Sequence, residues 1–511
     1  MCKNFSYNCF DDFILINNRH KLYIHKKDQK YVIKSDLITQ LVNKTVTNKN
    51  NEVTNCIINN NDVTNCITNK NNNDNNNEVT NCIINNNEVT NCITNKNNND
   101  NNNELITCID QIRNILENYN STDLQIVGLP DMHLGYSFPI GTVVAMPLET
   151  AQIAPEGVGF DINCGVRCLI TNLSYKDVKP FLIPLSQSLY SANSAGQQKT
   201  KFIPSISLMK SILNEGIKGL YSSSNLLKLP MLYESFSGYD QYVEDSGSIK
   251  GDFKLLSQKQ IGKGIKMLGT LGSGNHYLEV QRIEEIYDVE EKRLKKDQIV
   301  IFIHCGSRGL GQDVCSSFLS KSLFHDLTSE TGKKYFDSMN TAANYAYANR
   351  EVISMIVKKV FQSFFPSVKI DILYDCGHNV AKIEQIDGID YLVHRKGASR
   401  AFPGQYVAVG GSMATNSYIL KGLDSKKTFY SACHGSGRLI PRKLANKILS
   451  YEQIVEDMKK KEIILMCDTK TGVVEEAGEC YKSIDEVVEH CEKMRITKTV
   501  SKNVPLIVIK G

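Results

Sequence analysis

The chain has 511 residues, 41% of them hydrophobic, which is enough for a buried core in one large domain or in two or three ordinary ones. A formal net charge of +4 is small for this length, so composition argues neither for nor against a nucleic-acid partner, and any anion site must be local. No apolar run approaches the roughly 18 residues of a membrane-spanning helix and no secretory signal is visible, so we expect no membrane association, reduced thiols and a cytoplasmic location, with a nuclear pool also open.

The first 103 residues divide into two regions. Residues 1–43 alternate short apolar runs with polar turns, which predicts a small β-rich or αβ start of the folded region that ends in a helix near Ser35–Val42. Residues 44–103 are rich in asparagine, and the unit EVTNCIINNN that begins at Glu52 recurs at Glu78, a period of 26 residues. Two units are fewer than the roughly three that a β-solenoid needs, and no histidine accompanies the repeated cysteines to complete a zinc site. We therefore predict a disordered surface insertion.

The folded chain resumes at residue 104 and continues to residue 511. Glu104–Asn118 is predicted to be a helix, since Leu105, Ile109, Ile112 and Leu116 share one face, and 125–146 is predicted to be a strand, a glycine-rich loop and a strand. Residues 175–260 are mainly helical and polar, which is typical of a scaffold. Further strands are predicted at Gln298–Ile303, Val368–Tyr374, Tyr391–Val393, Tyr406–Val409 and Leu506–Ile509, and helices at Tyr335–Phe365 and Asp485–Met494. Because strands and helices are interleaved without regular βαβ spacing, we predict an α+β fold with mixed β-sheets and interleaved helices.

A possible metal site begins in the segment FDINCGVR, residues 160–167, where Asp161 and Cys164 lie three residues apart in a turn. A carboxylate and a thiolate together suit a borderline divalent ion such as Mn²⁺, Fe²⁺ or Zn²⁺. His276, His304 and His378 occur in similar glycine-containing turns and are candidates for the missing ligands. A histidine after a strand is more often a core or loop residue, but the recurrence of the pattern favours a site.

A fourth histidine, His434, lies in the loop SACHGSGR and has a different candidate role. The P-loop, Rossmann and zinc-protease motifs and the Lys-x-Asp-Gly site of ordinary nucleotidyl ligases are absent, so a covalent nucleotide would need another nucleophile. A neutral imidazole can attack phosphorus, and the neighbouring backbone amides and Arg438 can hold phosphates. Two further loops, 393–400 and 409–417, are candidate phosphate cradles or solvated turns.

Eight motifs of the chain resemble, in order, those of the RtcB family of RNA-splicing ligases. They are GFDINCGVR, GTLGSGNHYLE, HCGSRGLG, YDCGHN, HRKGASRAFPG, GGSMATNSYIL, CHGSGR and the closing VIKG. The resemblance covers roughly 104–511 and, more weakly, the first 43 residues. It implies an enzyme that joins an RNA 3′-phosphate or 2′,3′-cyclic phosphate to a 5′-hydroxyl, using GTP and two Mn²⁺ ions, through a guanylylated histidine and an RNA end activated as ppG.

Carried onto this chain, the resemblance makes His434 the guanylylated residue and implies two sets of ligands. The metal ligands are Asp161, Cys164, His276, His304 and His378. The GTP pocket is lined by Asn275, His276, Tyr277, Leu278, Glu279, His378, Asn379, Gly410, Gly411, Ser412, Met413, Ser417, His434, Gly435, Ser436, Gly437, Tyr481 and Lys510. The chain departs from the family pattern in the short connection after Gly404, in Cys305 and Cys376 beside metal histidines, and in its asparagine repeats.

The resemblance also implies partners and leaves two rival functions. An RNA ligase of this kind acts on broken RNA such as tRNA exon halves, in tRNA splicing or RNA repair, and family members often depend on the activator archease or on a tRNA-ligase complex. A metal-dependent phosphoesterase acting on RNA ends would use the same ligands to activate water. A catalytically inactive RNA-binding member would be expected to lose ligands, and none is lost.

Overall fold

A computed structural model describes residues 108–119, 123–195, 203–222, 236, 238–320 and 322–511, together with three short strands nearer the N-terminus. These strands, β1 (Tyr7–Cys9), β2 (Phe13–Ile16) and β3 (His20–Tyr23), form an antiparallel sheet, as the β-rich start predicted. The predicted helix near Ser35–Val42 and the asparagine-rich insertion lie outside the described residues.

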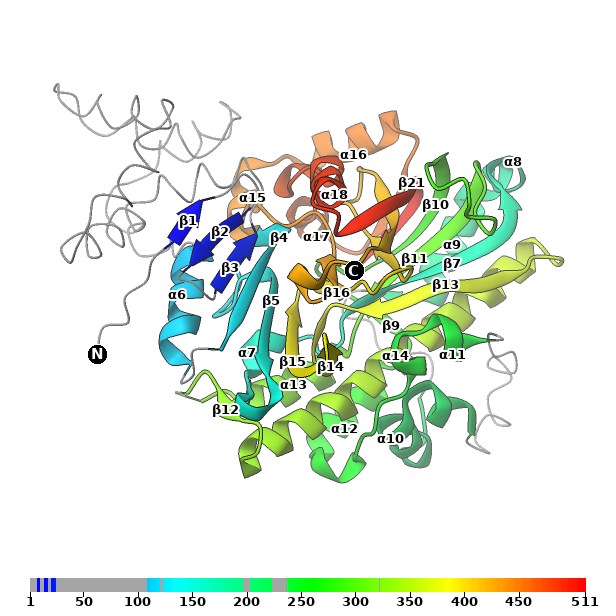
Figure 1. Ribbon diagram of the computed structural model, residues 1–511. Helices are drawn as coiled ribbons and strands as arrows, with labels where there is room; N and C mark the ends of the chain where they lie inside the picture. Colours follow the sequence, from blue (N-terminus) through cyan, green and yellow to red (C-terminus); the bar gives the residue numbers. More distant parts are fainter. Residues whose placement is uncertain are drawn as a thin grey trace, which may run out of the picture.

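An eight-stranded sheet forms the larger half of the described fold (Figure 1). Its strands in spatial order are β13 (Ile370–Gly377), β7 (Gly165–Ser174), β11 (Gln298–Cys305), β10 (Tyr277–Ile286), β21 (Thr497–Lys510), β18 (Ser417–Gly422) and β17 (Tyr406–Val409), and β20 (Ile464–Cys467) also pairs with β21. All neighbours are antiparallel except β20 and β21, which are parallel, so the sheet is mixed, as predicted.

A four-stranded antiparallel sheet forms the second half, in the order β14 (Asn379–Ile386), β15 (Ile389–Lys396), β5 (Ile140–Pro147) and β4 (Gln125–His133). The expected strand, loop and strand of 125–146 are β4 and β5. Short pairs complete the strands: β16 (Ala398–Arg400) with β19 (Ser431–Cys433), β6 (Gln152–Ile153) with β12 (His325–Asp326), and β8 (Ser194–Ala195) with β9 (Thr270–Gly272).

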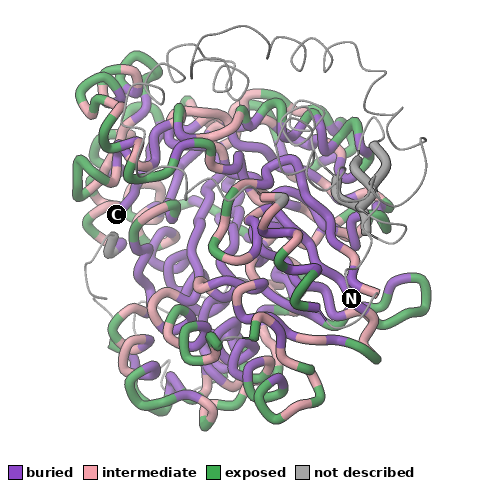
Figure 2. Tube along the Cα trace, turned by 90° about the vertical axis from the view of Figure 1, so that its left-hand side faces the viewer, coloured by how far each residue is buried: buried purple, intermediate pink, exposed green. Residues whose placement is uncertain are grey.

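The longest helix, α14 (Glu330–Phe364), begins where the Ser329 hydroxyl accepts a hydrogen bond from the Gly332 amide. Every residue from 338 to 357 is buried, because this helix packs against helices as well as strands, and small alanines allow the close approach. Figure 2 shows buried residues concentrated inside and exposed residues at the outer turns. None of the described helices is long and apolar enough to cross a membrane.

The other helices lie around the two sheets (Figure 1). They are α6 (Cys108–Asn118), α7 (Pro155–Val158), α8 (Tyr175–Val178), α9 (Leu182–Ala192), α10 (Ile206–Ser222), α11 (Tyr239–Tyr242), α12 (Gln258–Met267), α13 (Arg308–Ser317), α15 (Arg442–Ile448), α16 (Tyr451–Lys460), α17 (Lys470–Glu475) and α18 (Ile484–Lys493). The described part of 175–260 is mainly helical, as predicted. The α+β prediction is therefore confirmed.

Candidate metal and nucleotide site

The register of the large sheet brings four separate ligand segments together where strands β7, β10, β11 and β13 start or end on the same side of the sheet. Because neighbouring strands are antiparallel, the starts of β7 and β10 lie beside the ends of β11 and β13. His304 pairs with Tyr277 on one side and with Val166 on the other, and Gly377 pairs with Gly165. Residues that immediately precede or end these strands therefore converge although they are far apart in sequence.

The turn before β7 is held in a shape that points Asp161 and Cys164 toward these histidines. Asn163 has a left-handed φ of 53°, which asparagine tolerates better than most residues. The Cys164 amide donates to the Asp161 carbonyl oxygen at 3.0 Å, and the His378 amide donates to the Cys164 carbonyl oxygen at 2.7 Å. The turn is thereby tied directly to another ligand segment.

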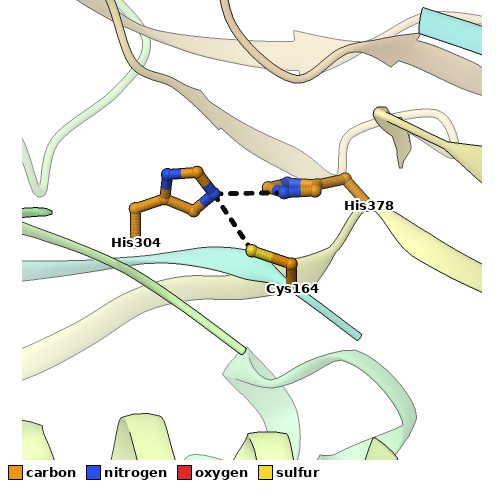
Figure 3. A group of neighbouring side chains, drawn as sticks. All are labelled: Cys164, His304 and His378. Atoms are coloured by element: carbon orange, nitrogen blue, oxygen red, sulfur yellow. Dashed lines mark hydrogen bonds between the residues drawn. The ribbon is translucent and has the colours of Figure 1, made fainter. Parts of the chain in front are cut away.

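The five predicted metal ligands form two groups that share one sulfur. Cys164, His304 and His378 form the first group (Figure 3), and Asp161, Cys164 and His276 form the second. Within the first, His304 Nε2 lies 3.2 Å from Cys164 Sγ and 3.1 Å from His378 Nε2. Within the second, His276 Nε2 lies 3.3 Å from Cys164 Sγ and 2.8 Å from Asp161 Oδ2. Two groups that share a sulfur offer the mixed hard and soft ligands that borderline divalent ions prefer.

Backbone carbonyls orient two of the imidazoles. His276 Nδ1 lies 2.9 Å from the Leu271 carbonyl oxygen, and His304 Nδ1 lies 3.0 Å from the Asn275 carbonyl oxygen. A neutral imidazole that donates from Nδ1 keeps the lone pair of Nε2, the atom that faces the cluster, for a metal ion. The donor set and its orientation therefore fit a divalent metal.

Protonation in the metal-free cluster follows from burial and neighbouring charge. Burial, reinforced by adjacent imidazoles, lowers the pKa of His304 and of His378 well below the ordinary range, so both rings are neutral. Burial, reinforced by the Asp161 carboxylate, raises the pKa of the Cys164 thiol to about 12. A metal ion must therefore displace the thiol proton when it binds.

A buried arginine of α14, Arg350, holds the ligand segments in place. Its Nη1 donates to the carbonyl oxygens of Asn163 at 2.8 Å and of Cys305 at 2.9 Å, and its Nε donates to Asp375 at 2.8 Å. Asn163 and Cys305 adjoin metal-ligand candidates, and Asp375 precedes His378 by three residues. One guanidinium thus connects three ligand segments.

The candidate nucleophile lies next to this cluster. The rings of His434 and His378 have centroids 4.7 Å apart. This proximity follows from β16, whose Ala398 donates to the His378 carbonyl oxygen at 3.1 Å and pairs with Cys433.

A buried carboxylate, Asp131 at the end of β4, orients His434. Asp131 Oδ2 lies 2.7 Å from His434 Nδ1 and accepts from the backbone amides of His434 at 2.9 Å and Gly435 at 3.3 Å. The carboxylate keeps the proton on Nδ1, so Nε2 carries the nucleophilic lone pair. Sequence reasoning missed Asp131, since its only signal was a carboxylate before a glycine-rich loop.

The two glycine-rich loops expected at a nucleotide meet beside His434. Gly410 and Gly435 form an isolated β-bridge, and a Cβ atom on Gly410 would lie 1.9 Å from Tyr277 Oη, so only glycine allows this approach. Among the described residues, the buried Tyr277 Oη and Ser436 Oγ have no hydrogen-bond partner. Two such atoms near a candidate nucleophile fit a polar ligand.

The remaining predicted pocket residues fall into two polar sets. Gln281 Nε2 donates to Glu279 at 2.6 Å and to Ser417 at 3.0 Å, and burial raises the pKa of Glu279 to about 7. Buried Glu476, which sequence reasoning missed, lies 3.6 Å from Lys510 Nζ and accepts a hydrogen bond from Tyr481. Lys510, which is basic, and Glu279, which is acidic, are thus candidates to contact a nucleotide base.

Other predicted pocket residues have clear local roles. Asn379 bridges two loops, since its Oδ1 accepts from the Gly397 amide at 2.9 Å and its Nδ2 donates to the Asp161 carbonyl oxygen at 3.2 Å. Leu278 packs in the hydrophobic core on a strand that is paired on both sides, so its contact with a nucleotide stays a prediction. Asn275, Gly411, Ser412, Met413 and Gly437 lie in the loops already described or beside them, and their contact with a nucleotide stays a prediction.

One expectation from the sequence is wrong: the basic loop 393–400 is not a phosphate cradle. His394 accepts from the Ala154 amide at 3.1 Å, and Lys396 donates to the Phe138 carbonyl oxygen at 2.9 Å. Arg395 is fully buried and makes two hydrogen bonds to Glu384, at 2.8 and 2.7 Å. These side chains connect β15 to its surroundings because the strand lies inside its sheet.

The cysteines noted as departures are buried and packed. Cys305 Sγ donates to the Leu271 carbonyl oxygen at 3.1 Å, and Cys376 Sγ contacts the Gly377 carbonyl oxygen at 3.6 Å. The ten described cysteines from Cys108 to Cys491 are free thiols. The short connection after Gly404 is a turn. The Gly404 amide closes it by donating to the Gly422 carbonyl oxygen at 2.9 Å.

Comparison with known proteins places this geometry in a family. The model of the family described as tRNA-splicing ligase RtcB matches residues 111–511. The chain belongs to the RtcB family. RNA-splicing ligase RtcB homolog 2 of Entamoeba dispar is 43% identical over 432 residues, which is 76% of this chain and 81% of that protein. RNA-splicing ligase RtcB homolog 1 of Entamoeba histolytica is 42% identical over 433 residues, covering 76% and 81%. The tRNA-splicing ligase RtcB of Methanococcus maripaludis is 37% identical over 432 residues, covering 75% and 88%.

Proposed function

We propose that this RNA ligase of the RtcB family joins an RNA 3′-phosphate or 2′,3′-cyclic phosphate to a 5′-hydroxyl, with GTP and two Mn²⁺ ions, through guanylylated His434. The observation that carries the proposal is the arrangement of His434, whose Nδ1 is held by Asp131 at 2.7 Å and whose ring lies 4.7 Å from that of His378. A nucleophile beside a metal-ligand cluster is the arrangement that attack on a phosphate requires.

The two metal-ligand groups would hold the Mn²⁺ ions, which neutralise charge on phosphoryl oxygens when bound. The protein itself supplies the nucleophile and its orientation. Nε2 of His434 attacks the α-phosphorus of GTP; the nitrogen–phosphorus bond forms, the bond to the bridging oxygen breaks, and pyrophosphate leaves. Asp131 retains the proton on Nδ1 and balances the positive charge that the ring acquires.

Two further transfers complete the ligation. An oxygen of the RNA 3′-phosphate attacks the guanylyl phosphorus and releases His434, so the RNA end carries a pyrophosphate-linked guanosine. The 5′-hydroxyl of the second strand then attacks the RNA phosphorus, GMP leaves and the hydroxyl proton passes to solvent. A 2′,3′-cyclic phosphate must first be opened by water to the 3′-phosphate.

The rival function is a metal-dependent phosphoesterase acting on RNA ends, which the same ligand groups would serve. It would not need the glycine-rich loop 409–417, which forms a bridge from Gly410 to Gly435, or the terminal Lys510. Incubation with labelled GTP and Mn²⁺, followed by a denaturing gel, separates the two functions, because only the ligase forms a protein–GMP adduct.

His434→Ala should retain Mn²⁺, form no adduct and ligate no RNA, yet still join an RNA whose 3′-end is supplied with ppG. His325→Ala, on β12, is the matched control and should behave as the wild type. An acid-labile adduct that persists in the His434 variant would show that another residue is the nucleophile.

The proposal also covers the partners of the protein and its location in the cell. Its partner is RNA, such as tRNA exon halves, with an archease activator or a tRNA-ligase complex, and its location is cytoplasmic with a nuclear pool. Family membership over 111–511 supports the RNA substrate. Affinity purification followed by identification of bound RNA and proteins, together with cell fractionation, tests them.

A further inference from the structure

Apolar side chains are exposed to solvent on residues 134–139, the loop that connects β4 and β5. The two strands are labelled in Figure 1. Tyr136 is 68% exposed, more than any other aromatic residue among the exposed large hydrophobics of the described chain, and Leu134 is 46% exposed. Single exposed apolar residues are ordinary, so this exposure needs support from how the loop is built and where it lies.

Buried contacts fix the backbone that carries Tyr136. Gln111 of α6, 4% exposed, donates to the carbonyl oxygens of Gly135 at 2.9 Å and Tyr136 at 2.8 Å, and accepts from the Gly135 amide at 3.2 Å. Phe138, on the same loop, is fully buried and packs edge-on against Phe324 with ring centroids 5.8 Å apart. The exposed ring is therefore presented by an anchored loop, which lowers the entropy lost when a ligand binds.

The two ends of the loop adjoin the candidate nucleophile and the segment of a metal ligand. At one end, the ring of His133 is stacked nearly parallel to that of His434, with centroids 6.5 Å apart. At the other, the Tyr136 ring packs edge-on against Phe160, with centroids 5.9 Å apart, and Phe160 immediately precedes Asp161. The aromatic pair of Tyr136 and Phe160 therefore adjoins the segment that carries the candidate ligand Asp161.

We propose that Tyr136, supported by Phe160, is a stacking platform for one nucleobase of the RNA end that enters the site. The proposal rests on the proposed function, because it assigns the RNA path of that same site. Unpaired bases at RNA ends stack on aromatic side chains without sequence preference. A tyrosine can bury about 150–250 Å², which suits one base, whereas a protein partner needs roughly 800 Å² on each side.

The test measures each step of ligation separately in Tyr136→Ala. We expect an unchanged protein–GMP adduct, since that step precedes RNA, and a KM for RNA raised about 5- to 100-fold, the range expected for loss of one base–aromatic stack. Tyr136→Phe and Tyr136→Trp should restore the KM. Tyr287→Ala is the matched control, since Tyr287 is 49% exposed but follows the far end of β10.

The RNA strand is then varied to identify the stacked base. If the effect falls on conversion of a 3′-phosphate RNA to its ppG form, the base belongs to the 3′-strand; if it falls only on joining a pre-activated RNA, the base belongs to the 5′-hydroxyl strand. An abasic nucleotide at that end should impair the wild type by a similar factor and add nothing in Tyr136→Ala.

Three results would overturn the platform: an unchanged KM for both strands, an effect that persists fully with abasic ends on both strands, or loss of the protein–GMP adduct in Tyr136→Ala. Failure of the wild type to form the adduct would instead overturn the proposed function. The two failures are therefore distinguishable. Tyr136 is exposed, so its replacement by alanine should leave the melting temperature unchanged.

Discussion

Asp131→Asn tests whether the carboxylate beside His434 acts through its charge. The amide oxygen of asparagine can still accept from His434 Nδ1 and from the backbone, so the variant keeps the shape of the contact and loses the negative charge. In the wild type, Asp131 Oδ2 accepts from His434 Nδ1 at 2.7 Å and from the His434 amide at 2.9 Å. A hydrogen bond to a charged group contributes about 1 kcal/mol more than a neutral one.

The Nδ1 contact matters most, because the ring becomes positively charged as the bond from Nε2 to phosphorus forms. Loss of about 1–3 kcal/mol of stabilisation in that step corresponds to an approximately 5- to 150-fold slower rate. The assay is the single-turnover rate of protein–GMP formation, with Mn²⁺ content measured beside it. Asp390→Asn, an exposed position in the β14–β15 hairpin, is the control. Wild-type guanylylation in Asp131→Asn would refute the charge argument.

Three further predictions concern the metal ligands, the base pocket and the asparagine repeats. Because its sulfur belongs to both ligand groups, Cys164→Ser should lower Mn²⁺ affinity by more than the roughly 10- to 100-fold that loss of an outer ligand contact costs. Asp161→Ala should lower the affinity further. Metal analysis checks both variants, with Cys467→Ser as the control, and full occupancy in both would remove the two residues from the site. Burial raises the pKa of Glu279 to about 7, so its carboxyl gains negative charge as pH rises through 7. The N1–H and N2–H donors of guanine bind more strongly to a carboxylate than to a neutral carboxyl group, so GTP affinity should rise over this range. A Glu279→Gln variant that keeps the same pH dependence would contradict the assignment. Deletion of Thr45–Asn103 should leave ligation intact and change the free energy of unfolding by less than about 2 kcal/mol, as denaturant titration would show; insoluble protein would count against an insertion.

The chemistry of the metal site could be predicted from residue types, but its assembly could not. Asp161, Cys164 and the three histidines stood out because soft and hard ligands recurred in glycine-containing turns. Their convergence depends on strand register, and β10 pairs with β21, whose Thr497–Lys510 lies more than two hundred residues later. Turn composition says nothing about such long-range pairing, and a slip of one residue would turn every side chain to the other face.

The basic loop shows the opposite failure, in which residue type suggested function and packing decided otherwise. A basic run alone is usually a solvated surface, but 393–400 and 409–417 both lie between His378 and His434, and this pairing of loops indicated an anion pocket. In the fold, β15 is an inner strand, and alternation sends Arg395 to Glu384 while Lys396 reaches a carbonyl oxygen on the other side. The position of a strand within its sheet determines this outcome, and periodicity alone does not reveal it.

The buried charges behind the metal site fix its geometry and do not add to the stability of the fold. Arg167 and Arg350 contact Asp375, and Arg167 also contacts Glu351, with all four side chains fully buried. Removing charges from water costs several kcal/mol each, so apolar residues of similar volume would stabilise the core at least as well. Apolar residues could not donate to two backbone carbonyls at once, as Arg350 does beside the segments of Cys164 and His304. The network therefore sets the directions of the ligands, at a cost that the surrounding hydrophobic core offsets.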